Sequence, residues 1–325
     1  MRYSILSSIV LCISGLCLQT ACNNEDDRAE MLDFNEVQGR QIEFDFKGIT
    51  EEYGITRSTP LPTSVTVWVT TDEGRYWYPY IWDESKKLWK PKSTAVTWTN
   101  RIMTIYAAVR GDLTDDTWSN TFTIQPNQTT SENLLKSDFL GARQHVSYTS
   151  GRITMTLQHR IAKLIVLAQL DTADDKANLN TCETISSSIR IQNTASTGHG
   201  KIPITGSITC GGLNVDVNAN IQQTVDEEII YSQDDAQYYD FIKFYKDNNA
   251  NAADIDKISG LASERTAVFY AYFINQSKKA IGLKFTYNKN GTTYTLSPNF
   301  RYEQGGIGLE AGCNSCITLF MPQVQ

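Results

Sequence analysis

Histidine is scarce in this chain, and the spacing of the histidines does not match that of a metal site. The three histidines are His145, His159 and His199, and none stands in a metal-binding spacing such as His-x-x-x-His. The chain also lacks the Gly-x-Ser-x-Gly turn that presents the nucleophile of many hydrolases. A calcium-type loop begins at Asp247 but lacks the glycine and glutamate that this geometry demands. We therefore expect no enzyme, no metal and no cofactor, although an unmarked pair of glycosidase carboxylates stays open.

Runs of basic residues are missing as well. The formal net charge is −7, with 29 Lys and Arg against 36 Asp and Glu. Without a basic stripe, nucleic acid and anionic lipid surfaces are poor candidate partners. Beyond the N-terminus, no apolar stretch reaches the roughly 20 residues that a membrane-spanning helix needs.

The N-terminus carries the strongest signal in the sequence. Met1-Arg2 precedes an uncharged run from Tyr3 to Ala21, and Cys22 follows at once. A positive start, a short apolar core and a small residue before the cut define an export signal. A cysteine directly after the cut resembles a bacterial lipoprotein signal. We predict a signal peptide over residues 1–21 and a lipidated Cys22, with an uncleaved transmembrane helix as the alternative.

The predicted lipid on Cys22 determines where the protein is anchored. Bacterial lipoproteins carry two or three acyl chains, such as palmitate, on this cysteine, and stable anchoring needs at least two signals. The acidic Glu25-Asp26-Asp27 resembles the surface-export tag of Bacteroidota lipoproteins, or else it is a solvated part of the tether over residues 22–40. We expect a protein anchored in the outer membrane and exposed on the cell surface.

Four further cysteines belong to the folded part: Cys182, Cys210, Cys313 and Cys316. In an exported protein such cysteines indicate disulfides first. Three connectivities are open, and we favour Cys182–Cys210 because it closes a loop within one domain. A zinc site or a redox Cys-x-x-Cys remains the alternative.

Short alternating strands fill the rest of the chain. Gln41–Lys47 places Ile42, Phe44 and Phe46 on one face and polar residues on the other, which is typical of a half-buried strand. Asn290-Gly291 predicts a tight hairpin turn. Glu132–Leu140 suggests a helical turn or two. Two such series of strands predict an all-β fold of two antiparallel sandwich domains, over residues 41–150 and 151–325.

Tryptophans crowd one segment of the first series: Trp77, Trp82 and Trp89. Exposed aromatic faces would stack on sugar rings. Cross-strand and core packing is the competing interpretation, because aromatic residues favour strands.

The order of several motifs resembles the fimbrillin-like proteins of Bacteroidota, the subunits of type V pili. After the lipoprotein signal and the first strand, the motifs are Gly54–Thr59, Ile102–Ala108, Asp138–Ala142, Thr156–Leu164 and Gly308–Gly312. Two features depart from that family. Cys313 and Cys316 stand where it usually has Thr or Tyr, and the tryptophan-rich segment is unusually dense.

This resemblance implies a transthyretin-like topology for both sandwiches and assembly by strand exchange. In the family, proteolysis after the first strand removes that strand and opens a groove for a neighbouring subunit, and Arg57 matches the cleavage site by position. The expected function is a fimbrial subunit, or an anchor or accessory protein, that serves adhesion and meets other pilins and host or bacterial surface ligands. The alternative is a surface glycan-binding lipoprotein that uses exposed Trp and Tyr residues.

Overall fold

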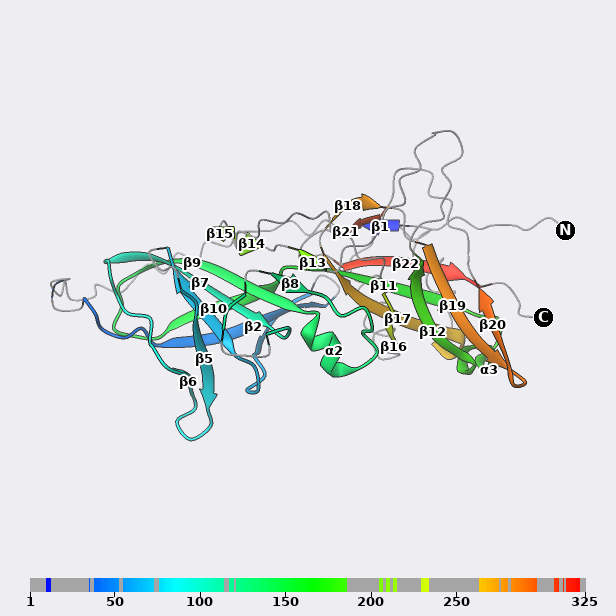
Figure 1. Ribbon diagram of the computed structural model, residues 1–325, viewed down its shortest axis with the longest axis horizontal. Coiled ribbons are helices and arrows are strands. Elements are labelled where there is room, and N and C mark those ends of the chain that lie inside the picture. Colours follow the sequence, from blue (N-terminus) through cyan, green and yellow to red (C-terminus); the bar gives the residue numbers. More distant parts are fainter. Residues whose placement is uncertain are drawn as a thin grey trace.

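Strands dominate the structure (Figure 1), and the predicted all-β fold class is confirmed. The computed structural model describes residues 10–12, 35, 38–52, 55–72, 76–113, 117–119, 121–185, 205–206, 209–210, 213–214, 229–233, 263–274, 276–279, 282–296, 307–309, 312 and 314–321. Cys22 and most of the predicted signal and tether lie outside these residues.

One sheet has eight strands. They are β2 Phe44–Glu52, β3 Ile55–Pro60, β4 Val67–Thr71, β5 Tyr78–Asp83, β6 Leu88–Pro91, β7 Ile102–Arg110, β9 Phe139–Ser147 and β10 Ile153–His159. Their order across the sheet is β3-β2-β10-β9-β7-β4-β5-β6. Neighbours are antiparallel except β2 and β10, which are parallel. The sheet folds over its own core, because Phe46 of β2 packs on Trp89 of β6 with ring centroids 5.5 Å apart.

The second half of the chain builds a five-stranded and a three-stranded sheet. The first contains β1 Val10–Cys12, β11 Ala162–Gln169, β16 Ser232–Gln233, β17 Thr266–Phe273 and β22 Asn314–Phe320. The second contains β12 Leu179–Ile185, β19 Gly282–Lys289 and β20 Thr292–Leu296. β11 lies in the interior of its sheet, antiparallel to β17 and parallel to β22. β1 falls within the predicted signal peptide and pairs here with β22.

Shorter strands pair outside these sheets. β8 Phe122–Thr123 pairs with β13 Thr205–Gly206, β14 Thr209–Cys210 with β15 Leu213–Asn214, and β18 Gln276–Lys279 with β21 Ile307–Leu309. The first of these pairs joins a segment from the second half of the chain to the first half.

Local sequence rules explain the turns and the helices. Asn290 and Gly291 adopt φ of 52° and 77° between β19 and β20, the two positive angles of a tight hairpin turn. This prediction is confirmed. The helix α2, Ser131–Lys136, begins at Thr130, whose side chain accepts a hydrogen bond from the Asn133 amide. Thr172 caps α3, Ala173–Ala177, in the same way, and η1 is a 3-10 turn over Ser263–Arg265. Each hydroxyl satisfies an amide that the helix leaves unpaired.

The described part of the structure has two large apolar cores. Along the chain, the residues of the first core end at Leu157 and those of the second begin at Ala162. β10 belongs to the eight-stranded sheet, and its Ile153, Met155 and Leu157 lie in the first core. The pattern of β10 alone cannot show this, since an alternating strand reads the same at the end of one domain and at the start of the next. The domain boundary near residue 150 stays a prediction.

Gln128 ties the two halves together. Its side chain is fully buried, and its amide donates to the Tyr272 carbonyl at 2.9 Å and accepts from the Tyr272 amide at 2.8 Å. Its backbone amide donates to the Ile230 carbonyl at 3.0 Å. A segment of the first half therefore pairs with β17 and with the chain leading into β16, as an additional strand would.

A buried arginine secures the neighbouring segment. The Arg110 guanidinium pairs with the Asp112 carboxylate at 2.7 Å and donates to the carbonyls of Ser119 and Thr121. The same group lies over the rings of Trp118, Phe122 and Phe139 at 4.8–5.8 Å. A buried charge is tolerated only when its donors are satisfied in this manner.

We expect Gln128→Ala to lower the free energy of unfolding by about 2–4 kcal/mol, because it leaves a buried amide and a buried carbonyl of Tyr272 unpaired. Urea denaturation of the full chain measures this. Gln158→Ala is the control, since Gln158 is exposed, and its effect should stay within about 0.5 kcal/mol. Equal effects would show that Gln128 does not couple the two cores.

Candidate functional site

The first strand is buried deep in the core of the eight-stranded sheet. Ile42, Phe44 and Phe46 expose 1%, 1% and 2% of their surface, so the predicted apolar face is the buried face. The rings of Phe44 and Phe46 stack at 5.3 Å, and both meet Tyr80 edge-on. Burial raises the pKa of Tyr80 to about 12, and its hydroxyl accepts a hydrogen bond from the Val96 amide at 2.8 Å.

Backbone pairing holds this strand on several sides. Residues 39–42 bond to residues 96–98 through hydrogen bonds of 2.8–2.9 Å. Beyond them, β2 pairs in parallel with β10 from Phe44 to Gly48 and antiparallel with β3 from Lys47 to Glu52. The regular strand therefore runs further than the predicted Gln41–Lys47. Losing it would uncover the edge of β10 together with the core beneath it.

Arg57 lies in β3, opposite Thr50, rather than in an irregular loop. β3 is one of the two outer strands of the eight-stranded sheet. A cut after Arg57 would fall within β3 and would separate all of β2 from the rest of the fold. The side chain of Arg57 lies outside the described part of the chain.

The three tryptophans of the crowded segment pack against other aromatic rings. Trp89 exposes only 5% of its surface and packs on Phe46, so the expected sugar contact at Trp89 is wrong. Trp82 meets Trp89 edge-on at 5.6 Å and donates to Glu84 at 3.0 Å. Trp77 stacks on Trp118 at 4.0 Å. A short strand alternates in the same way whichever face is buried, so the sequence could not decide between these interpretations.

Cys182 is a free, fully buried thiol. The favoured Cys182–Cys210 disulfide is therefore not formed in the structure. Burial, with a smaller contribution from Glu183, raises the pKa of the Cys182 thiol well above its usual range. The side chains of Cys210, Cys313 and Cys316 lie outside the described residues.

The two described histidines have structural partners. His145 Nδ1 lies 2.9 Å from the Thr104 hydroxyl, and His159 Nδ1 lies 2.7 Å from Asp138. Within the described residues, no group of three or more His, Cys, Asp and Glu side chains is arranged to hold a metal ion. No described helix is long and apolar enough to cross a membrane.

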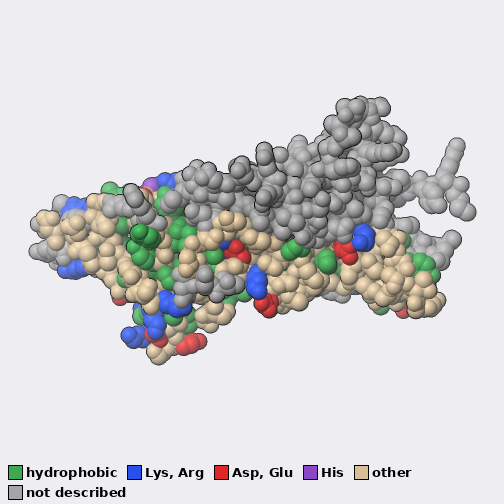
Figure 2. Space-filling view, viewed as in Figure 1, with side chains coloured by type: hydrophobic (Ala, Val, Ile, Leu, Met, Phe, Trp, Pro, Cys, Tyr) green, Lys and Arg blue, Asp and Glu red, His purple; other side chains and the backbone are tan. Residues whose placement is uncertain are grey.

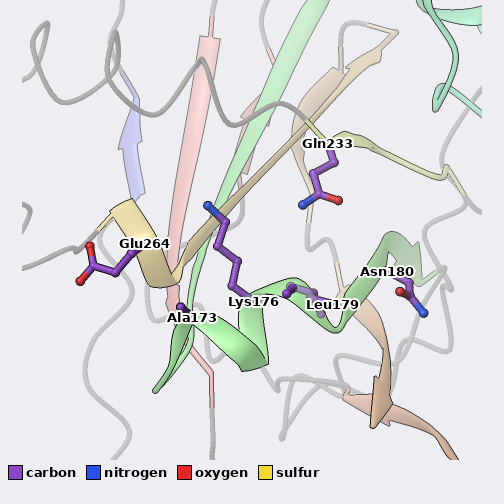
Figure 3. A pocket seen from close by; sticks show the side chains of 7 residues that line it. Ala173, Lys176, Leu179, Asn180, Gln233 and Glu264 are labelled. Carbon is purple, nitrogen blue, oxygen red and sulfur yellow. The ribbon is translucent and has the colours of Figure 1, made fainter. Parts of the chain in front are cut away.

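A surface hollow of about 520 Å³ lies beside α3 (Figure 3). Its lining residues are Ala173, Lys176, Ala177, Leu179, Asn180, Gln233 and Glu264. In Figure 3 the side chains of Lys176 and Gln233 extend toward the same space, whereas Glu264 extends away from them. One acidic side chain among the described lining residues does not make the carboxylate pair that glycoside hydrolysis requires.

A fimbrillin-like family model matches residues 64–319, which is most of the chain. The chain belongs to the fimbrillin-like family. Among curated proteins, none matches the sequence.

Solved structures resemble this fimbrillin-like chain at low sequence identity, and the first of those that follow shares its fold. A candidate cell adhesion protein from Bacteroides ovatus is 12% identical, with 87% of this chain and 92% of that one covered and a TM-score of 0.50. A candidate cell adhesion protein from Bacteroides uniformis is 11% identical, with 87% and 93% covered and a TM-score of 0.44. A fimbrial protein from Bacteroides ovatus is 11% identical, with 88% and 51% covered and a TM-score of 0.37.

We expect Phe44→Ala to cost about 3–5 kcal/mol of unfolding free energy, because it empties a large volume beside Tyr80 and Phe46. Chemical denaturation of the uncut chain measures this. Lys47→Ala lies in the same strand with an exposed side chain and should change stability by less than about 0.5 kcal/mol. Equal stability of Phe44→Ala and Lys47→Ala would show that the apolar face of β2 does not stabilise the core.

We expect the Cys182 thiol to resist alkylation in the folded protein and to react readily once the chain is unfolded, because the thiolate is the reactive species. The protein is alkylated before or after denaturation and digested without a reductant. Mass spectrometry of the peptides then measures the fraction of Cys182 that is alkylated in each state. A cross-linked Cys182–Cys210 peptide in that digest would contradict the free thiol.

Proposed function

We propose that the protein is a surface-exposed subunit, or an anchor or accessory component, of a type V pilus, that it assembles by β-strand donation and that it serves adhesion. One observation supports this most strongly. A single segment before Arg57 places Ile42, Phe44 and Phe46 in the first core. Membership in the fimbrillin-like family supports the same function.

The energetics favour replacement of the first strand. Burying three large apolar side chains contributes roughly 5–9 kcal/mol as an upper bound, whereas a domain is stable by only about 5–15 kcal/mol. A chain cut after Arg57 would thus be close to unfolding, with bare backbone groups along β10. A donated strand from a neighbouring subunit would restore both the pairing and the apolar contacts.

The anchor and the domains belong to the same proposal. Lipid on Cys22 would hold the uncut chain at the outer membrane, and a cut after Arg57 would release lipid and first strand together.

We assign each large core to one sandwich domain, with the boundary between His159 and Ala162, because the apolar clusters divide there.

N-terminal analysis of the protein recovered from its own bacterium tests the proposal. We expect assembled protein to begin at Ser58, and Arg57→Ala to keep the lipidated Cys22 and to lose polymerisation. Arg40→Ala is the matched control, because exposed Arg40 precedes β2 and a cut there would leave that strand in place.

Wild-type protein with an intact lipidated Cys22, running only as a monomer, would overturn assembly by strand exchange. Co-purification of that uncut form with other pilins would identify it as an anchor subunit.

A further inference from the structure

Among the described strands, β20 is an outer edge that lacks the protective residues found at the edges of the larger sheet. β20 reads Thr292-Thr293-Tyr294-Thr295-Leu296, and its first four residues are exposed. Within the described residues its sheet ends at β20, in the order β12-β19-β20. By contrast, the edge strands β6 and β3 carry Lys90-Pro91 and Arg57 with Pro60. Charge and proline are the usual means of preventing edge-to-edge pairing, and β20 has neither.

The hairpin turn fixes which backbone groups of β20 point outward. A two-residue turn makes its flanking pair, Lys289 and Thr292, a hydrogen-bonded pair. Hydrogen-bonded and non-hydrogen-bonded pairs then alternate along the strands. Tyr294 therefore bonds inward to Tyr287, while the amides and carbonyls of Thr293 and Thr295 point away from β19. These outward groups form a short ladder ready for another strand.

This edge complements itself. Thr293-Tyr294-Thr295 reads the same in both directions, so a two-fold axis at Tyr294 would place Thr293 opposite Thr295 of a second copy. Both residues direct their backbone groups outward, so each such pair can exchange two N–H···O bonds. Thr–Thr and aromatic–aromatic pairs are favourable across strands, and β20 carries no charge that would repel its own copy.

From these features we infer that β20 is a homodimer interface, in which the occupant of its edge is β20 of a second copy, antiparallel and centred on Tyr294. Two three-stranded sheets then join into one continuous sheet. The two Tyr294 rings lie side by side on the face where Tyr294 already meets Tyr287, at 6.5 Å. Figure 2 shows charged side chains on the projecting β5–β6 hairpin of the larger sheet.

This pairing uses an edge in the second core, apart from the first strand and Arg57. It does not rest on the proposed function, because the Arg57→Ala chain keeps the same β20. A dimer that forms equally in that variant would separate this contact from strand exchange.

Analytical ultracentrifugation of the mature lipid-anchored chain in mild detergent tests the interface. We expect a dimer that dissociates on dilution. Thr293→Pro should weaken it at least about tenfold, because two outward hydrogen bonds are lost across the two-fold axis. The fold should survive this change, since that amide makes no bond to β19 and edge strands tolerate proline there. Thr293→Ala keeps the amide and should still dimerise.

Cross-linking tests the register independently. Tyr294→Cys should give a disulfide-linked dimer on mild oxidation, because directly opposed residues in a non-hydrogen-bonded pair have Cβ atoms about 4.5–5.5 Å apart. Thr292→Cys faces Leu296 of the second copy and should remain unlinked. A chain that stays monomeric at every concentration overturns the proposal, even if β20 pairs with a different protein. Equal cross-linking of the two variants, or unchanged dimerisation of Thr293→Pro, overturns it as well.

Discussion

The packing of Phe44 and Phe46 against Tyr80 and Trp89 is the contact on which the first half of the structure depends. The eight-stranded sheet bends so that β2 and β6, which are far apart in strand order, face each other across one core. A sheet of this size normally needs a second layer to cover its apolar face. Here both layers come from the same sheet, and the rings of β2 fill the space between them. The strand that the proposed cleavage after Arg57 would remove is thus also the strand that closes the core.

The two cores are joined by polar groups rather than by apolar surface alone. Gln128 supplies the hydrogen bonds of an extra strand residue, and Arg110 satisfies carbonyls in the segment that carries β8. Low-dielectric surroundings make such groups costly when unpaired and specific when satisfied. A small apolar cluster around Phe122, Phe139 and Ile161 lies beside them. These contacts would keep the two halves in one arrangement in the proposed strand exchange as well.

Local patterns predicted part of this fold well. The alternation of Ile42, Phe44 and Phe46 identified a buried face, and Asn290-Gly291 identified a turn, because both depend only on neighbouring residues. The parallel pairing of β2 with β10 could not be predicted, since it depends on residues about a hundred positions away. The same limit explains Cys182, whose pairing depends on a distance in space, and Trp89, whose burial depends on how the sheet curves. Nothing in the sequence near Gln128 indicates that its side chain joins the two halves of the chain.

The parallel pairing of β2 and β10 also affects the order in which the chain folds. Glu43 and Arg152, which form an ion pair beside this contact, are 109 positions apart in the chain. Contacts between residues so distant carry a large loop-closure entropy and form slowly. The hairpins and meanders of β4 to β9 join nearer residues and can assemble first. We therefore expect the first strand to dock last. In the proposed assembly, a strand from a neighbouring chain would repeat this latest step of folding.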